Sequence, residues 1–392
     1  MTRKSKNGNS FVPPAVLVRT VEWTRHRLLR LHLRLLPAPA AMMEMIVGGW
    51  PAQAITTAAQ LGVADALGDG PLAIDELAAR VGADADALGR LLRALAGRGV
   101  FRHRRDGRYE LNSLADTLRS DAPISLAGAA LFNGSKEQRE RWTLLADSVR
   151  TGKSIVPAMH GKEGFDYLAE QPELAELFNQ TMTSIAQMTV ATVVAGYDFS
   201  AYRTVVDVGG GQGTLLAAIL AAAPDSLGVL YDLPPVVATA PNVLREYNVA
   251  DRVRIATGSF FDSVPSDGDA YVLKNIVHDW TDEKALQILR NVRTAAGPRT
   301  TVLLVEVVVR GHYRDCPENW MDLEMLLNLG SRERTEDEYR ELLSKAGFRM
   351  TRVVQTASPL CVVEAKVDPK PAGSPGSSLR TFPEGYPVDP RR

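Results

Sequence analysis

The sequence predicts an α/β fold: a seven-stranded, mostly parallel sheet, preceded by an all-helical unit with a small wing. From Tyr202 onward, short apolar runs alternate with helical stretches. Fully apolar runs of this length, separated by helices, are typical of a parallel sheet covered on both faces. In residues 42–118, apolar residues instead recur at helical spacing. The two textures therefore indicate two structural units.

Seven apolar runs are expected to form the strands of the sheet. The five that alternate with helices are Thr204–Val208, Val229–Asp232, Val253–Ala256, Ala270–Leu273 and Thr301–Val307. Two more runs, Phe348–Gln355 and Leu360–Lys366, are joined by a short Ala-Ser-Pro turn. We expect these last two to pair as an antiparallel edge.

The winged unit is predicted from two helices and a hairpin. Apolar residues repeat at helical spacing in residues 74–81 and again in residues 88–95, and Asp84 is the expected N-cap of the second helix. Phe101–His103 and Arg108–Leu111 flank Asp106-Gly107 and are expected to form the hairpin.

The chain is divided into five parts. They are a basic N-terminal extension (1–41), the winged unit (42–118), a helical linker that lines the substrate (119–200), the sheet-containing unit (201–366) and a disordered tail (367–392). The extension contains five arginines among leucines in Val18–Leu36, a pattern compatible with a basic amphipathic helix. Such a helix can contact a membrane surface or a partner. The preferred interpretation is a variable extension that packs on a neighbouring subunit or stays mobile.

Composition excludes several classes of protein. The formal net charge of −1 over 392 residues gives no general reason to expect a nucleic acid or an anionic membrane as partner. No run of about 18 apolar residues is present, so stable membrane insertion is not expected. Two distant cysteines fit a reducing compartment, and no signal peptide is recognised. We therefore expect a cytoplasmic protein.

A glycine-rich turn follows the first strand, in residues Asp207–Gly213. Glycine permits positive φ and close approach of a ligand, and the N–H groups of the following helix favour an anion such as a carboxylate. The sequence G-G-G-Q-G does not fit the dinucleotide motif G-x-G-x-x-G, and no G-K-[ST] follows for a triphosphate. The second strand ends at Asp232, about 20 residues on, where a carboxylate can hold a ribose diol. Together these features predict a small-molecule cofactor.

Further candidates follow the other strands, at the edge where open parallel sheets bind ligands. After the third strand, Phe260 or Phe261 is a candidate to pack on an adenine, with Ser259 at its edge; the alternative is that a phenylalanine fills the core. After the fourth strand come His278-Asp279-Trp280. Two acids, Glu306 in the fifth strand and Glu333 further on, belong to the same edge.

These motifs resemble the caffeate and hydroxyindole type of O-methyltransferases, which includes bacterial enzymes that tailor aromatic polyketides. The resemblance rests on Asp207–Gly213, on Leu273–Trp280 and on Glu333-Arg334-Thr335, and it covers roughly residues 42–366. It implies a Rossmann-like class I methyltransferase domain preceded by a winged-helix dimerisation domain. It also implies an intertwined homodimer and S-adenosyl-L-methionine as cofactor.

The resemblance also implies roles for single residues. His278 corresponds to the general base, with Glu306 and Glu333 as the acids that orient it. Ser259 departs from plant members, which usually carry Asp there, and this weakens a plant phenylpropanoid substrate. The resemblance places Gly209 and Gly211 at the methionine part of the cofactor, Asp232 at the ribose, and Ser259, Phe260 and Lys274 around the adenine; Asp207 and Leu233 are further cofactor-binding candidates.

The chemistry favours a phenolic acceptor. A phenol of pKa ~10 loses its proton more easily than an aliphatic alcohol. An unperturbed histidine of pKa ~6.5 is mostly neutral at pH 7 and can accept that proton. No cluster of carboxylates suggests a divalent metal in the sequence, so we predict a reaction that needs no metal. Candidate acceptor contacts are Met182, Asp322, Met325 and Asn328, with Phe132, Trp142, Met188 and Met321 as further candidates.

Two alternative functions stay open at this point. A protein of the same fold can retain the cofactor but catalyse hydroxylation or another step without methyl transfer. The winged unit can also belong to a DNA-binding regulator, supported by Arg104, Arg105 and Arg108 on the wing. Against the regulator, Asp84 and Asp86 begin the helix that would contact DNA.

Overall fold

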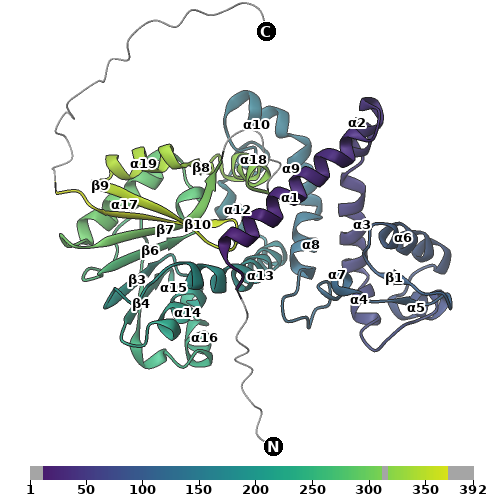
Figure 1. The fold of residues 1–392 in the computed structure, drawn as a ribbon, viewed down its shortest axis with the longest axis horizontal. Helices are drawn as coiled ribbons and strands as arrows, with labels where there is room; N and C mark the ends of the chain where they lie inside the picture. Colours follow the sequence, from purple (N-terminus) through teal and green to yellow (C-terminus); the bar gives the residue numbers. More distant parts are fainter. Residues whose placement is uncertain (1–11, 311–316, 370–392) are drawn as a thin grey trace, which may run out of the picture.

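The computed structural model describes residues 12–310 and 317–369 of the chain. Figure 1 shows the sheet-containing part on the left and the small winged part on the right, with a group of helices between them. The expected disordered tail, residues 367–392, lies outside the described residues from residue 370 onward.

The main sheet contains every strand that the sequence predicts, with bounds that differ by at most two residues. Its strand order is β5-β4-β3-β6-β7-β10-β9, and a short β8 pairs with β7. The strands are β3 (Thr204–Val208), β4 (Leu227–Asp232), β5 (Val253–Thr257), β6 (Ala270–Lys274), β7 (Thr301–Val309), β8 (Arg334–Thr335), β9 (Phe348–Gln355) and β10 (Leu360–Val367).

The order of the strands determines where a ligand can bind. β3 pairs in parallel with β4 on one side and with β6 on the other. The chain therefore runs outward from β3 to β5 and returns to the other side of β3 at β6. Such a reversal opens a crevice at the carboxyl ends of the strands. β10 lies between β7 and β9 and is antiparallel to both. The last two strands therefore pair as expected, and β9 is the strand at the edge of the sheet.

Helices cover both faces of the sheet because alternate residues of each strand point to opposite faces. Val205 of β3 belongs to a buried cluster with residues of α13 and α14. Its neighbour Val206 belongs to another cluster, with residues of α17 and α19. The helices of this part are α14 (Thr214–Ala222), α15 (Pro234–Val237), α16 (Ala240–Glu246), α17 (Asp282–Ala295), α18 (Pro317–Leu329) and α19 (Glu336–Lys345), with short 3-10 helices η1 (Ala250–Arg252) and η2 (Val277–Asp279).

The winged unit forms as the sequence predicts. Asp84 precedes α6 and accepts a hydrogen bond from the Ala87 N–H at 2.8 Å, as expected of an N-cap. The wing pairs Arg102 with Glu110 and His103 with Tyr109. The elements are α3 (Gly49–Gln60), α4 (Val63–Ala66), α5 (Ile74–Val81), α6 (Ala85–Gly97), β1 (Arg102–His103), β2 (Tyr109–Glu110) and α7 (Ser113–Asp116).

Six helices join the winged unit to the sheet. The long α13 packs against α8 on one side and against α14 on the other. The six helices are α8 (Ala127–Asn133), α9 (Lys136–Thr143), α10 (Leu145–Thr151), α11 (Val156–His160), α12 (Gly164–Ala169) and α13 (Pro172–Gly196). The five-part division of the chain stays a prediction.

The described part of the N-terminal extension contains α1 (Ala15–Arg34) and the start of α2 (Ala38–Ile46), and neither helix contains a buried residue. The expected basic helix is therefore present in α1. None of the helices described in residues 12–310 and 317–369 is long and apolar enough to span a membrane.

Candidate active site

The glycine turn after β3 meets the end of β4. Gly209 and Gly211 have φ of 68° and 62°, which residues with a Cβ rarely adopt. The Gly211 N–H donates to Oδ2 of Asp232 at 2.8 Å, and the Leu233 N–H donates to Oδ1 of the same carboxylate at 2.7 Å. The structure thus brings the predicted turn and the predicted ribose-binding acid together.

The turn is crowded on one side and open on another. A Cβ added to Gly209 would lie 2.4 Å from Cδ1 of Ile276 and 3.4 Å from the ring of Phe260. A Cβ added to Gly211 would meet no atom within 4 Å. A ligand can therefore approach the backbone at Gly211, while Gly209 allows the close contact with the loop after β6.

Two buried charged groups lie beneath the turn. Burial raises the pKa of Asp207 to about 7, although nearby Lys274 opposes the shift. Burial also lowers the pKa of Lys274, against the carboxylates of Asp207 and Glu306. Oδ2 of Asp207 is buried and has no hydrogen-bond partner among the described residues. This carboxylate oxygen is available to a donor group on a ligand.

The residues predicted around an adenine lie after β5. The Ser259 hydroxyl accepts a hydrogen bond from the Phe261 N–H at 3.2 Å. Phe260 and Phe261 are both half-buried, and both rings pack edge-on against Trp280, with centroids 6.1 and 4.7 Å away. Phe260 also borders Gly209, so it is the better placed of the two for a ligand in the turn.

His278 lies in η2, immediately after β6, and is only 9% exposed. Its Nδ1 is 2.8 Å from Oε1 of Glu333 and 3.9 Å from Oε2 of Glu306. Its Nε2 is 3.3 Å from Oδ1 of Asp279. Glu306 also accepts the N–H groups of Ile276 and Val277, at 3.0 and 2.8 Å. The structure thus brings together the three residues singled out in the sequence and adds Asp279.

The charge of this cluster bears on one expectation. Burial lowers the pKa of His278, but the carboxylates of Glu306, Asp279 and Glu333 outweigh it and raise the pKa to about 10. Burial raises the pKa of Glu306 to about 7 and that of Asp279 to about 6. These surroundings therefore do not favour the expectation of a mostly neutral imidazole at pH 7. It assumed an unperturbed histidine, whereas three acids surround this one.

The same cluster has the donor set of a metal site. His278, Glu306 and Glu333 each offer one ligand atom, and these atoms lie within 4.8 Å of one another. The sequence suggested no cluster of carboxylates for a divalent metal, whereas the fold assembles such a group from distant segments. The cluster already pairs its imidazole with a carboxylate, however, and a reaction that needs no metal stays a prediction.

The acceptor candidates are spread over several elements. Asp322 on α18 accepts the Glu333 N–H at 2.8 Å, which places it beside the cluster around His278. Asn328 on the same helix is buried, and its Oδ1 accepts from Arg141 at 2.7 Å. Met182 lies on α13 and Met325 on α18. Contact of these four residues with an acceptor stays a prediction.

A buried acid on α18 was not expected from the sequence. Glu324 accepts hydrogen bonds from Gln138 and from the indole of Trp142, both at 2.9 Å, and burial raises its pKa. These contacts tie α18 to α9. Trp142, one of the candidate acceptor contacts, is therefore held in place by the Glu324 carboxylate. The only signal in the sequence was the spacing of Glu324 and Asn328, one helical turn apart.

Three arginines of the wing pair with acids of the wing itself. Arg104 and Arg102 contact Glu110 at 3.0 and 3.2 Å, and Arg108 contacts Asp106 at 2.7 Å. Charges neutralised in this way bind phosphate poorly. The geometry therefore does not favour the DNA-binding alternative.

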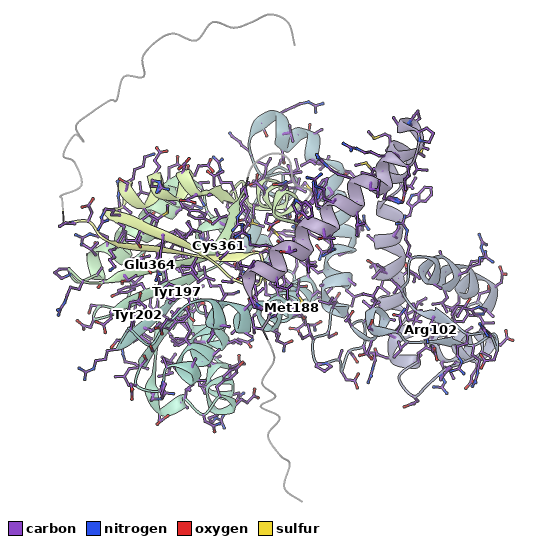
Figure 2. The ribbon with its side chains drawn as sticks, in the orientation of Figure 1. Arg102, Met188, Tyr197, Tyr202, Cys361 and Glu364 are labelled. Atoms are coloured by element: carbon purple, nitrogen blue, oxygen red, sulfur yellow. The ribbon has the colours of Figure 1, made fainter. Side chains whose placement is uncertain are left out.

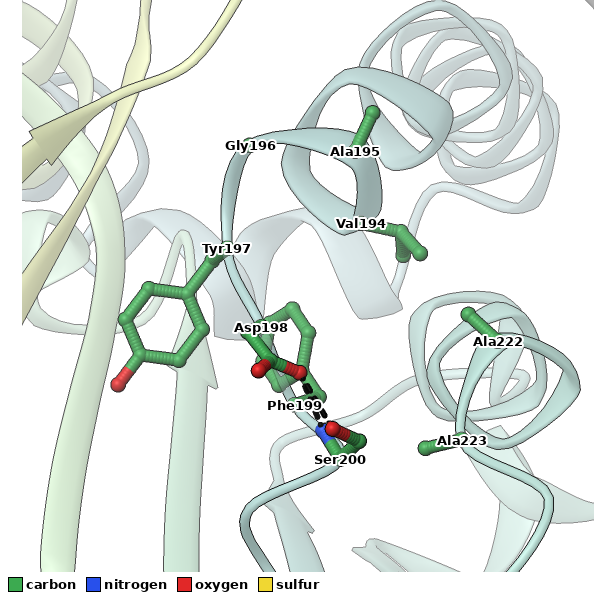
Figure 3. Close-up of a pocket in the computed structure, with 9 residues that line it drawn as sticks. All are labelled: Val194, Ala195, Gly196, Tyr197, Asp198, Phe199, Ser200, Ala222 and Ala223. Atoms are coloured by element: carbon green, nitrogen blue, oxygen red, sulfur yellow. Dashed lines mark hydrogen bonds between the residues drawn. The ribbon is translucent and has the colours of Figure 1, made fainter.

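A cavity of about 300 Å³ lies at the opposite edge of the sheet. Figure 3 shows its lining at the end of α13 and the end of α14, close to where β3 and β4 begin. Nearby, Figure 2 labels Tyr197, Tyr202 and Glu364. The Tyr197 hydroxyl is 2.7 Å from both Glu364 and the Tyr202 hydroxyl. This hydrogen-bonded group joins the end of α13 to β10, and the cavity is separate from the cluster around His278.

Two family models match the chain. The O-methyltransferase domain matches residues 142–349, and the O-methyltransferase dimerisation domain matches residues 43–121. A phenazine O-methyltransferase from Lysobacter antibioticus is 40% identical over 330 residues, 84% of this chain and 96% of that protein. An 8-amino-8-demethylriboflavin N,N-dimethyltransferase from Streptomyces davaonensis is 34% identical, over 79% of this chain and 89% of that protein.

A solved structure adds ligands to the comparison. An O-methyltransferase of neocarzinostatin biosynthesis was crystallised with S-adenosylmethionine and 2-hydroxy-5-methyl naphthoic acid. It superposes with a TM-score of 0.69 at 33% identity, covering 81% of this chain and 95% of that one. The shared fold thus holds the cofactor and an aromatic hydroxy acid together in a related protein.

Proposed function

The chain belongs to the O-methyltransferase family, and from this premise we propose that it transfers a methyl group to a hydroxyl of a small aromatic molecule, with His278 as the general base. The observation that carries the proposal is a buried imidazole, hydrogen-bonded to a carboxylate, at the sheet edge that also bears an open glycine turn. A base and a cofactor-binding turn on one edge can bring an acceptor oxygen and a methyl donor together.

The residues around the turn fit S-adenosylmethionine, the cofactor of the family. When bound, it supplies a methyl group activated by a positively charged sulfur. The unpartnered Asp207 oxygen suits the amino group of the cofactor, and the open side of Gly211 suits its carboxylate. Each oxygen of Asp232 takes one backbone N–H and keeps a lone pair for a ribose hydroxyl. We assign Asp207, Gly209 and Gly211 to the methionine part, Asp232 and Leu233 to the ribose, and Ser259, Phe260 and Lys274 to the adenine.

The imidazole provides the proton chemistry. Nδ1 of His278 is occupied by Glu333, so Nε2 is the nitrogen that would accept the proton of the acceptor hydroxyl. The imidazolium that forms is stabilised by the carboxylates of Glu306, Glu333 and Asp279. Asp279 must move or share its place at Nε2 when the acceptor binds. The same acids make a proton-free imidazole scarce at neutral pH, so turnover is expected to rise as pH increases.

An aromatic acceptor is favoured by the base and by the relatives. A phenol has a pKa ~10, close to that of this imidazole, so transfer of the proton costs little. The relatives compared above act, by their names, on a phenazine and on an aminoriboflavin, and the solved complex holds a naphthoic acid. The aminoriboflavin relative makes an aromatic amine the nearest alternative acceptor.

The test uses S-adenosylmethionine with a deuterated methyl group and a panel that includes 2-hydroxy-5-methyl naphthoic acid and 3-amino-4-hydroxybenzoate. Mass spectrometry is expected to find a product heavier by one CD3 in place of H, with EDTA present throughout. Retained cofactor without a labelled product from any acceptor would instead support hydroxylation or another step on the same fold. Activity abolished by EDTA and restored by a divalent cation would contradict the metal-free reaction.

The homodimer belongs to the proposal as well. The first residues that match the dimerisation domain expose a row of large apolar side chains. These side chains are removed from water only when another chain covers them. Trp50 is 73% exposed. The others are Met43, Met45 and Ile46, together with Met42 immediately before the match. We infer that a second copy of the chain covers this surface, hereafter the α2–α3 surface.

The cytoplasm is the proposed location. The free, buried thiol of Cys361 suits a reducing compartment.

A further inference from the structure

Arg334 is buried without being part of the site described so far. It lies in β8, which pairs with the end of β7, and it is only 1% exposed. Its guanidinium donates to the Val277 carbonyl at 2.8 Å and to the Trp280 carbonyl at 3.0 Å. It also donates twice to Oδ1 of Asp282, at 2.7 and 3.1 Å. A buried arginine with such a set of acceptors is held in a single orientation.

The acceptors of Arg334 lie on both sides of the base. Val277 directly precedes His278, and Trp280 follows it by two residues. Both carbonyls belong to the segment 277–280, hereafter the base loop. A rotation of the base loop that moved the imidazole would have to break at least one of these hydrogen bonds.

The neighbouring residue holds the same segment from another point. Glu333 reaches the imidazole itself, at Nδ1. Successive residues of an extended chain point to opposite sides, so Glu333 and Arg334 contact different parts of the base loop. Glu306 takes the N–H groups of Ile276 and Val277. Glu306 therefore holds N–H groups at the start of this segment, and Arg334 holds the carbonyls of its first and last residues.

We propose that Arg334 is a positioning residue for methyl transfer: it fixes the backbone of the base loop and thereby the direction of the His278 imidazole. This inference rests on the proposed function of His278. A lysine at this position would keep the positive charge but could not make the same set of hydrogen bonds. An ammonium lacks the planar arrangement of donors that reaches two carbonyls and a carboxylate. The orientation of a catalytic group matters because small displacements reduce the rate strongly.

The alternative is that Arg334 only stabilises the fold, by joining β8 to the start of α17. The two roles differ in what they change. A stabilising residue alters the folded fraction and leaves the turnover of the folded enzyme intact. A positioning residue lowers kcat per folded molecule while the affinity for S-adenosylmethionine stays the same, since the glycine turn lies on other strands.

The experiment compares Arg334→Lys and Arg334→Ala with Arg332→Lys, whose side chain is exposed and pairs with Glu338. With 2-hydroxy-5-methyl naphthoic acid, or the panel acceptor that the wild type methylates, kcat of Arg334→Lys is expected to fall about 30-fold or more. The calorimetric Kd for S-adenosylmethionine is expected to stay within threefold. Arg332→Lys is expected to match the wild type. Wild-type kcat in Arg334→Lys, or equal losses in kcat and cofactor affinity, would overturn the proposal.

Chemical rescue adds a second measurement. A pocket of about 310 Å³ borders Arg334, with Asp282 and Glu338 among its lining residues, and gives a small cation access to the space left by Arg334→Ala. Guanidinium at non-denaturing concentration is expected to raise kcat of this variant several-fold, whereas equal NaCl is not. If neither Arg334 variant folds, Asp282→Ala removes one acceptor and is expected to lower kcat several-fold; unchanged kcat there would overturn the proposal. Wild-type methyl transfer is measured first, so failure of the proposed function is recognised separately.

Discussion

At the scale of single residues, the site is defined by one imidazole among three carboxylates. Each acid reaches His278 from a different place in the chain: Glu306 from β7, Glu333 from the residue before β8, and Asp279 from the next position. Buried carboxylates favour the protonated imidazole. His278 is therefore a strong base, but only a small fraction of its imidazole is without a proton at neutral pH. This compromise makes the pH dependence of turnover informative.

Replacing Glu306 by Gln is expected to move the rising limb of the kcat–pH profile toward lower pH by about one unit or more. The wild-type limb is expected well above pH 6.5, because three carboxylates raise the pKa of His278 to about 10. Removal of one negative charge lowers that pKa, so less alkali is needed to free the base. Steady-state rates from pH 6 to 10 test this, and a limb unmoved or shifted to higher pH would contradict it.

Asp232→Ala is expected to weaken binding of S-adenosylmethionine by about 2 kcal/mol, roughly thirtyfold in Kd, because a charged hydrogen-bond acceptor for the ribose is lost. Isothermal titration calorimetry measures the change. Asp225→Ala is the matched control, since Asp225 is exposed near the start of β4, at the other edge of the sheet. Equal affinities for the two variants would remove Asp232 from the cofactor site.

At the scale of elements, the strands could be predicted because their information is local. The run Thr204–Val208 is apolar at most positions and ends at glycines, and its strand has the expected bounds. Asp84 likewise carries a local signal, an acid before an apolar helical repeat, and it caps α6. Local periodicity and capping chemistry are thus sufficient for these elements.

The environment of the base could not be predicted in the same way. His278 and Glu333 are 55 residues apart, and whether their side chains meet depends on the order of strands. Contacts between distant segments produce the raised pKa of His278 and the burial of Glu324. They also produce the hydrogen bonds from Arg334 to the base loop. The family resemblance supplied the partners of the histidine, but not their effect on its charge.

The α2–α3 surface leads to a prediction about association. Ile46→Asp combined with Trp50→Asp is expected to convert the dimer to monomer at micromolar concentration, because two charges would be buried without partners. Sedimentation velocity measures the change. Leu114→Asp, at an exposed leucine outside this surface, serves as control. A double variant that stays dimeric, or a wild type that is monomeric, would contradict the proposed interface.

At the scale of the whole molecule, the structure buries several groups that bind protons more tightly when folded. Folding raises the pKa of His278 to about 10, that of Asp207 and of Glu306 to about 7, and that of Asp279 to about 6. Groups with raised pKa stabilise the fold at low pH, and this contribution is lost as pH rises through the folded pKa.

The cofactor-free protein is therefore expected to be less stable at pH 8 than at pH 6. One extra proton bound by the native state over two pH units is worth roughly 2.7 kcal/mol, and the expected loss is about 2 kcal/mol or more. Denaturant unfolding at the two pH values measures it. The slope is expected to be shallower in Glu306→Gln, whereas stability that rises from pH 6 to 8 would show that these groups are not perturbed.

The central claim, that His278 accepts the proton of an acceptor hydroxyl during methyl transfer, is tested most directly by comparing wild type with His278→Ala in the deuterated-methyl assay. The account predicts a labelled product from the wild type and a kcat at least 100-fold lower in His278→Ala, with unchanged affinity for S-adenosylmethionine. A variant that transfers the label at the wild-type rate would contradict it.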